Sequence, residues 1–161
     1  RDRRAGTTRG VWLSGPAGRQ ANTGYRFDPA ISLDGQVVAF ESSATNLVPG
    51  DTNGYNDIFV RDLRIHVTRR VSVSSTGRQG RFDSAQPSLS ADGRFVLTFN
   101  GEIYNHTELR AALESRGAVP DGGWRGHSDH EVFLQGIVTW GLKETLGRSA
   151  GMFAFALWDR R

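Results

Sequence analysis

Cysteine is absent from this sequence of 161 residues. Without thiols the chain has no disulfide, no thiolate metal site and no thiol nucleophile. Lysine is almost absent too, because Lys143 is the single one and the other basic residues are arginines spread along the chain. A nucleic-acid-binding protein more often gathers its basic residues on one face. The composition therefore predicts no nucleic-acid partner.

Long apolar runs are also missing. The longest, residues 152–158, is much shorter than the roughly 20 residues that a membrane-spanning helix needs, and the basic residues at the start lead into no apolar signal segment. We therefore expect a soluble chain with no membrane partner. Composition leaves the compartment open.

The first half of the sequence repeats itself at an offset of about 60 residues. Arg1-Asp2 matches Arg61-Asp62, and Ser32-x-Asp34-Gly35 matches Ser90-x-Asp92-Gly93. A repeat of this length indicates stacked supersecondary units. Within each unit the Asp-Gly pair suits a tight turn with positive φ.

Short apolar stretches at residues 37–40 and 58–60, and a stretch of alternating valines at 67–73, predict β-strands. The segments PAISLDGQVVAFESSATNLVPGDTNGYNDIFVRDL and RRVSVSSTGRQG resemble the WD40-like, TolB-type β-propeller repeats. The resemblance covers residues 1–97 and implies a binding scaffold of about one and a half blades. A closed propeller typically has 4 to 8.

One loop of this half offers several oxygen ligands in seven residues. Asp51, Asn53 and Asp57 make it a weak candidate for a calcium site. The EF-hand spacing of ligands is not met, and Asn, Asp and Gly are also the residues of a tight turn. The turn is the favoured interpretation, and no metal is expected.

From residue 99 onward the pattern changes to one of mixed helix and strand. Asn105 and Glu108 have the spacing of a capping box, and leucines and alanines at helical spacing follow them. The pattern predicts a first helix over residues 106–116, which Gly117 ends.

Ser128 and Glu131 repeat this spacing ahead of a second helix. Its expected inner stripe is Leu134, Ile137, Val138 and Gly141. Residues 152–158 are apolar at nearly every position, which predicts a strand covered on both faces. If the chain folds compactly, we expect this strand beside residues 99–104, in an ααβ unit packed loosely against the hairpins of the first half.

Three blocks of the second half, FNGEIYNHTELRAALESRG, WRGHSDHEVFLQGIVTWG and GMFAFALWDRR, resemble the glutaminase domain of class II glutamine amidotransferases, most closely that of asparagine synthetases. In that family an N-terminal cysteine attacks the amide of glutamine and ammonia passes to a second domain. The resemblance implies that Asn100 and Gly101 form an oxyanion hole, and that Glu102 and Asp129 bind the α-ammonium group of glutamine.

The resemblance implies no cofactor. If the amidotransferase ancestry determines the compartment, the expected location is cytoplasmic. Because the nucleophilic cysteine is absent, we predict no catalytic residue and no catalysis, with at most vestigial glutamine binding. Two alternatives stay open, a propeller-derived interaction module and a non-functional chimera. Both halves have unpaired strand edges, which favours self-association.

The sequence thus predicts two half-domains, residues 1–97 and 98–161, joined between Asp92 and Thr98 in a turn and strand that both families share. The expected fold class is α+β. Antiparallel β-hairpins of an incomplete propeller are followed by a partial α/β sandwich of the N-terminal-nucleophile hydrolase type. Whether the join is natural, an assembly error or engineered is left open.

Overall fold

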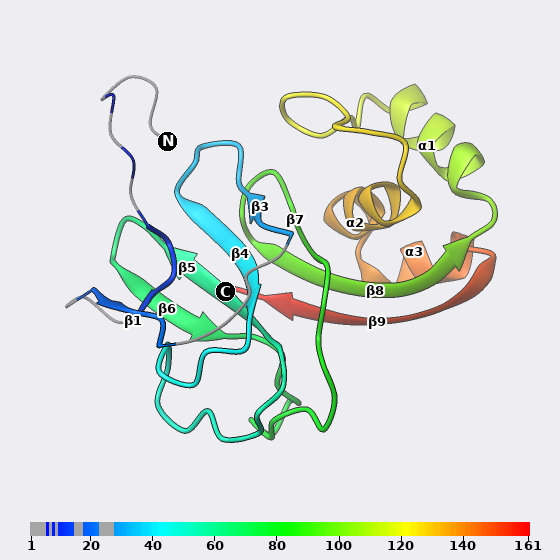
Figure 1. The fold of residues 1–161 in the computed structure, drawn as a ribbon. Helices are drawn as coiled ribbons and strands as arrows, with labels where there is room; N and C mark the ends of the chain where they lie inside the picture. Colours follow the sequence, from blue (N-terminus) through cyan, green and yellow to red (C-terminus); the bar gives the residue numbers. More distant parts are fainter. Residues whose placement is uncertain (1–5, 7, 9, 15–17, 23–27) are drawn as a thin grey trace.

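The computed structural model describes residues 6, 8, 10–14, 18–22 and 28–161 (Figure 1). Arg1-Asp2, the start of the predicted repeat, lies outside the described residues. The elements in chain order are β1 (Leu13–Ser14), β2 (Arg19–Gln20), β3 (Ala30–Ile31), β4 (Val37–Ser42), β5 (Asp57–Asp62), β6 (Val67–Arg70), β7 (Pro87–Leu89), β8 (Phe95–Ile103), α1 (His106–Ser115), α2 (Asp129–Trp140), α3 (Leu142–Arg148) and β9 (Gly151–Asp159). Antiparallel sheets and separate helices make this an α+β fold, as the sequence predicts.

The first half contains a four-stranded antiparallel sheet in the order β3-β4-β5-β6. Strands β4 and β5 are at its centre and are buried along almost their whole length. One face of the sheet packs on Leu47 and Ala44, and the other packs on Leu89 and Val96 of the following strands. A sheet covered on both faces explains why these strands are apolar rather than alternating.

The two Ser-x-Asp-Gly turns of the repeat have the same structure. The hydroxyl of Ser32 donates to Asp34 Oδ1 at 2.6 Å, and that of Ser90 donates to Asp92 Oδ1 at 2.6 Å. The glycines that follow have φ of 69° and 71°. The internal repeat of the sequence is therefore a repeat of structure, and its Asp-Gly turns are confirmed.

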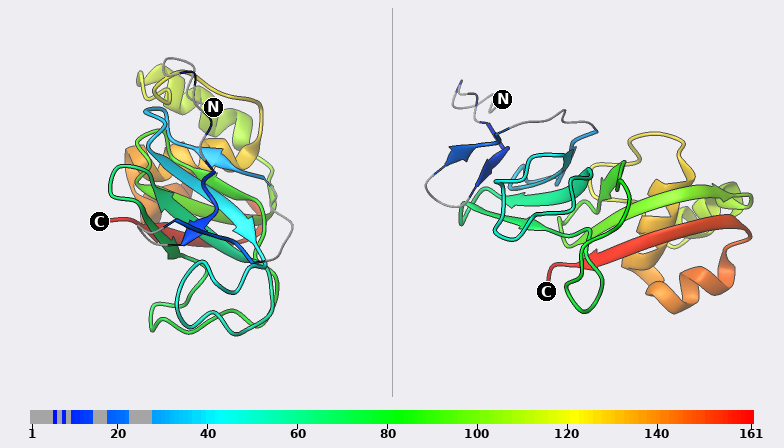
Figure 2. Two further views of the ribbon diagram at one scale, coloured as in Figure 1. Left: turned by 60° about the vertical axis from the view of Figure 1, so that its left-hand side comes forward. Right: turned by 60° about the horizontal axis from the view of Figure 1, so that its bottom comes forward.

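The second sheet joins the two halves of the sequence. Its order is β7-β8-β9, and β8 pairs with β9 over nine residues, from Phe95 with Asp159 to Ile103 with Gly151 (Figure 2). Strand β8 runs without a break across the predicted boundary between residues 97 and 98. The expected pairing of residues 99–104 with 152–158 is confirmed.

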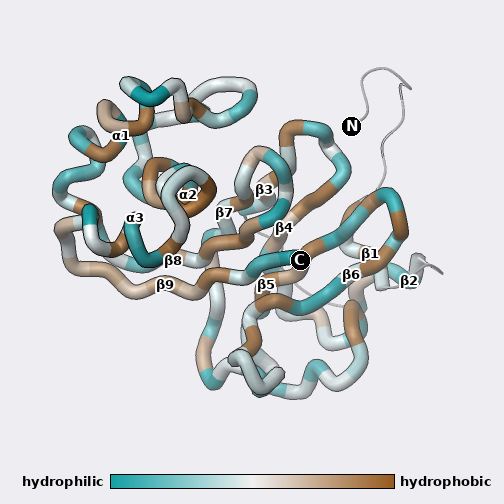
Figure 3. The backbone as a smooth tube through the Cα atoms, turned by 180° about the vertical axis from the view of Figure 1, so that it is seen from behind, coloured by the Kyte–Doolittle hydropathy of each residue, from teal (hydrophilic) through white to brown (hydrophobic). Residues whose placement is uncertain are grey.

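Three helices lie on one face of this second sheet (Figure 1), and hydrophobic segments of α2 and β8 face each other there (Figure 3). The core beneath the helices is rich in phenylalanine. The ring of Phe133 on α2 contacts those of Phe153 and Phe155 on β9, with centroids 5.4 and 5.3 Å apart. A second core lies between the two sheets, where Trp158 and Val96 pack with residues of β4 and β5. The two halves share this core, so they are not loosely packed as the sequence suggested.

The first two helices begin and end close to the expected residues, but their capping differs from the expectation. Asn105 makes no side-chain cap; its amide donates to the carbonyl of Arg148 at 2.9 Å and its Oδ1 accepts from the N–H of Ala150 at 2.8 Å. Glu131 accepts from the backbone N–H groups of Arg125 and Gly126, not from the start of its own helix. Both side chains therefore hold neighbouring segments in place.

Three expectations for the second half are wrong. Val138 is 41% exposed, because the buried face of α2 runs through residues 132–134, 136 and 137. Gly141 is exposed and ends α2 with φ of 83°, and the short helix α3 that follows it was not expected. Strand β9 is covered on one face along most of its length, since on the other face Met152 is 75% exposed, Ala154 and Ala156 are exposed, and Trp158 alone packs into a core.

No helix in the described part of the chain has the length and apolar character that crossing a membrane requires.

Candidate functional site

The Asn-Gly-Glu motif lies near the C-terminal end of β8. Phe95, Leu97 and Ile103 of this strand are buried beneath the helices. Asn100 and Glu102 alternate with them and are exposed on the opposite, open face of the sheet. Neither side chain makes a hydrogen bond with any of the residues that the structure describes, so both are available to a ligand.

Gly101, between these two residues, lies where strands β8 and β9 approach each other most closely. Its φ is 123°, and a Cβ atom there would come within 2.2 Å of the Met152 carbonyl oxygen and 2.6 Å of the Phe153 Cα atom. Only glycine fits at this position. The resemblance implies an oxyanion-hole role for Gly101, and the structure adds a second reason for a glycine here, the close approach of the β9 backbone.

Gly151 on β9 is the counterpart of Gly101, and sequence reasoning missed it. A Cβ atom at Gly151 would come within 2.2 Å of the Glu102 carbonyl oxygen. The two glycines thus lie on either side of Glu102 and set the path of its backbone. The signal in the sequence was a glycine at the start of an apolar strand, which alone does not reveal the neighbour that requires it.

Asp129, the first residue of α2, reaches β8 from the helix side of the sheet. Its Oδ2 accepts from the N–H of Ile103 at 2.9 Å and its Oδ1 accepts from the N–H of His130 at 2.8 Å. The structure therefore brings Asp129 next to the motif, one residue beyond Glu102. Asp129 thus lies at the same end of β8 as the motif but on the helix side, whereas the side chains of Asn100 and Glu102 are on the open face. Carboxylates of this kind can bind an ammonium group, and a side-chain amide can bind a polarised carbonyl.

The chain has no thiol to attack such a carbonyl. Among the described residues, no group of three or more His, Cys, Asp or Glu side chains is placed to hold a metal ion.

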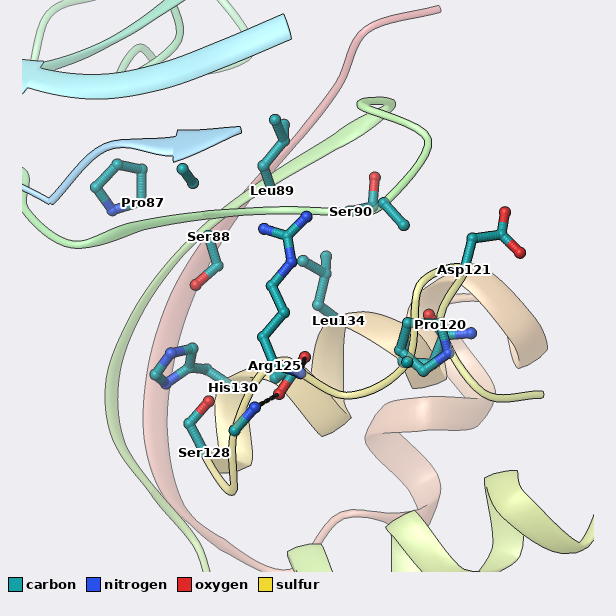
Figure 4. Close-up of a pocket in the computed structure, with 16 residues that line it drawn as sticks. Pro87, Ser88, Leu89, Ser90, Pro120, Asp121, Arg125, Ser128, His130 and Leu134 are labelled. Carbon is teal, nitrogen blue, oxygen red and sulfur yellow. Dashed lines mark hydrogen bonds between the residues drawn. The ribbon is translucent and has the colours of Figure 1, made fainter. Parts of the chain in front are cut away.

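The structure has a cavity of about 260 Å³ (Figure 4). None of the four candidate residues, Asn100, Gly101, Glu102 and Asp129, lines this cavity. It is formed by β7, the loop before α2 and the first turns of α2. Ser88, Ser128 and His130 lie at one end, and Arg125 extends past them to donate to the Ile31 carbonyl at 2.9 Å. The cavity therefore lies where residues from the two halves of the sequence meet.

The acidic residues of the weak calcium candidate form ion pairs with an arginine in the structure. Asp51 and Asp57 both form ion pairs with Arg70, at 2.9 and 3.3 Å, and the amide of Asn53 donates to Asp57 at 3.0 Å. The pKa of Asp51 is raised by burial, which Arg70 opposes. The guanidinium group is the cation that balances these carboxylates in the described structure.

Comparison with known proteins identifies the family of this chain. The family model of the glutamine amidotransferase domain matches residues 52–161, more than half of the chain. The chain is 51% identical over 70 residues, 43% of its length, to a provisionally named asparagine synthetase (glutamine-hydrolysing) of Mycobacterium tuberculosis. It is 35% identical over 92 residues, 57% of its length, to asparagine synthetase (glutamine-hydrolysing) 1 of Bacillus subtilis.

A plant relative, the asparagine synthetase (glutamine-hydrolysing) of Asparagus officinalis, is 41% identical over 76 residues, 47% of the chain. The matched segments make up 10%, 13% and 12% of the lengths of the three relatives. The match to the family model begins well before the predicted boundary at residue 98 and runs through the motif residues of β8 and α2. The chain therefore belongs to the glutamine amidotransferase domain family.

Proposed function

We propose that this chain contains part of a glutamine-binding site of the asparagine synthetase type. Glu102 and Asp129 bind the α-ammonium group of glutamine, and the Asn100 amide with the Gly101 N–H holds the amide oxygen. The observation that carries the proposal is the placement of these groups. Asn100 and Glu102 are exposed on β8 and have no side-chain hydrogen bond among the described residues, and Asp129 accepts from the backbone N–H of Ile103, the next residue of the same strand.

We further propose that the chain binds glutamine without hydrolysing it. Covalent hydrolysis in this family begins with attack by a thiolate, and the chain has no cysteine. Oxyanion donors and binding groups alone leave the amide intact, because they form no covalent bond to its carbonyl carbon.

The test is release of ammonia from L-glutamine by the purified 161-residue chain. We expect no release above the rate of buffer alone, at any pH between 6 and 9, because the chain has no thiol nucleophile. A hydrolysing asparagine synthetase assayed alongside shows that the assay detects turnover. Ammonia release that scales with protein concentration and is abolished by Glu102→Gln would contradict the proposal.

A specific observation also favours a second function for the first half. Strands β3 to β6 form an antiparallel sheet in which each strand pairs with the next, the arrangement of a propeller blade. We infer that this sheet is one blade-like unit of an interaction scaffold. We also infer that β7 to β9 with their helices are part of an N-terminal-nucleophile hydrolase sandwich, with the boundary inside β8.

A further inference from the structure

The open face of the second sheet continues from the candidate site toward the first half of the chain. Val96, Thr98, Asn100 and Glu102 are alternate residues of β8, so their side chains point to the same face. Val96, near the start of the strand, is buried in the core that the two halves share. Glu102 lies at the other end, where β8 leads into α1 (Figure 1). This face therefore connects the shared core with the Asn-Gly-Glu motif.

A second cavity, of about 430 Å³, lies on this face between the motif and the first half of the chain. Thr98 and the residue paired with it on β9, Ala156, both line the cavity. Apolar residues from both halves form most of the rest of its lining: Ile58, Val71, Val73, Val96, Leu157 and Trp158. Its volume is within the range of about 300–1,000 Å³ that small-molecule sites have. The cavity thus offers room for an apolar group next to Asn100 along the strand.

Arg78 is the one charged residue that lines this cavity in the described part of the chain. It lies in the turn after β6, where its backbone N–H donates to the hydroxyl of Ser74 at 3.1 Å. Its guanidinium group forms no hydrogen bond or ion pair with the residues that the structure describes. A ligand that combines an apolar group with a carboxylate therefore complements the cavity.

The length of a glutamyl group fits the spacing of the two exposed motif side chains. Asn100 and Glu102 are two positions apart on β8, which corresponds to about 6.6 Å along a strand. The chain from the α-nitrogen to the amide nitrogen of glutamine has as many atoms as two residues of backbone, so its extended length is similar. A glutamyl group with its ammonium at Glu102 and its amide at Asn100 therefore lies along the strand. Because amides are trans, a substituent on the amide nitrogen continues in the same direction, toward Thr98 and the cavity.

We propose that the site binds γ-glutamyl amino acids, in which the amide nitrogen of glutamine carries an amino acid with an apolar side chain. The proposal rests on the proposed function, because Asn100, Glu102 and Asp129 hold the glutamyl part as they hold glutamine. The apolar side chain occupies the cavity beside Trp158, and the free carboxylate pairs with Arg78. Glutamine itself has no group that reaches the cavity, so it binds more weakly.

Three ligands that differ by one group at a time test the proposal by NMR on the isotope-labelled chain. They are L-glutamine, the γ-glutamyl amide of phenylethylamine, which adds the apolar group, and γ-L-glutamyl-L-phenylalanine, which adds the carboxylate as well. We expect the phenylethyl amide to bind at least about tenfold more tightly than L-glutamine, the value of burying one aromatic side chain. The dipeptide is expected to bind about threefold more tightly again, the value of one exposed ion pair. Both compounds shift the indole N–H signal of Trp158, and L-glutamine does not.

Two substitutions remove the two new contacts separately. Ala156→Phe fills part of the cavity from an exposed position and is expected to bring the affinities for both phenyl compounds down to that for L-glutamine. Arg78→Gln is expected to make the dipeptide bind no more tightly than the phenylethyl amide. The matched control is Ala111→Phe, at an exposed position on α1, which is expected to keep both preferences. Circular dichroism of every variant reports whether the fold is kept.

Saturable binding of L-glutamine without a gain from the phenylethyl group overturns this proposal and leaves the proposed function standing. So does a gain that Ala156→Phe leaves unchanged, or equally tight binding of N-phenylethylacetamide, which lacks the glutamyl group. A dipeptide that binds no better than the phenylethyl amide overturns the pairing of its carboxylate with Arg78. If none of the ligands shifts the amide signals of residues 101–103, both this proposal and the proposed function fail.

Discussion

Replacing Arg70 by methionine is expected to lower the free energy of unfolding by about 3–5 kcal/mol at pH 7, the cost of leaving buried charges without a partner. Arg70 is 9% exposed in its side chain and pairs with Asp51 and Asp57, which are 4% and 1% exposed. It also donates to Gln79 at 2.9 Å and to the Gly50 carbonyl at 3.3 Å. Methionine keeps much of the volume and removes the only cation of this group.

The loss is expected to shrink at acidic pH. Burial already raises the pKa of Asp51, with Arg70 opposing that rise, so without Arg70 the pKa is higher still. A carboxyl whose pKa is raised in the folded state binds a proton that the unfolded chain lacks, so stability increases as pH falls from 7 toward about 4. Urea unfolding at both pH values measures the two effects.

Arg69→Met is the matched control, because Arg69 is the exposed neighbour on the same strand. Its loss is expected to change the free energy of unfolding by about 0.5 kcal/mol at most. If Arg70→Met were no more harmful than this control, the pairing of Arg70 with the two carboxylates would not stabilise the loop.

Replacing Gly101 by alanine is expected to destabilise the protein by about 3 kcal/mol or more. Backbone strain at positive φ costs about 1–3 kcal/mol, and forcing a methyl group into filled space costs a similar amount. The atoms in the way are the Met152 carbonyl oxygen at 2.2 Å and the Phe153 Cα at 2.6 Å, which are backbone and cannot rotate aside. The β8–β9 pair must open instead.

Gly147→Ala is the control for this substitution. Gly147 lies in α3, and nothing comes within 4 Å of a Cβ atom built there. Alanine is expected to leave stability unchanged or raise it by up to about 1 kcal/mol, because alanine favours a helix. Thermal unfolding compares the two variants, and amide hydrogen exchange across β8 and β9 locates the change. Equal stability of both variants would mean that the strands move apart freely at Gly101.

Local features of the fold were predictable from the sequence. The Asp-Gly turns, strands β4 and β5, and the starts of α1 and α2 depend on residues close together in the chain. The apolar pattern of β9 could not reveal its open face, because that depends on the absence of a covering layer. The helix α3 was missed because it has only seven residues and follows directly on a helix-ending glycine.

In the candidate site, too, the local features could be predicted from the sequence and the tertiary contacts could not. Asn100, Gly101 and Glu102 are consecutive, so any strand at this position places the two polar side chains on one face. Asp129 reaches the end of the motif from the helix side through a hydrogen bond with the backbone of Ile103, 26 positions earlier, which only the tertiary fold creates. For the same reason Asn105 and Glu131 were expected to cap their own helices but instead bind segments brought close by folding.

The most direct test of the proposed function is a comparison of two ligands by NMR on the isotope-labelled chain. L-glutamine is titrated beside 4-carbamoylbutanoate, the same molecule without the α-amino group. We expect glutamine alone to shift the amide signals of residues 101–103 and 129–130 to saturation. Glu102→Gln is expected to weaken binding at least about tenfold, the value of one charge-assisted hydrogen bond, while Glu108→Gln has no effect. Equal shifts with both ligands, or no saturable shift with glutamine, would contradict the proposal that this chain retains a site for the ammonium group of glutamine.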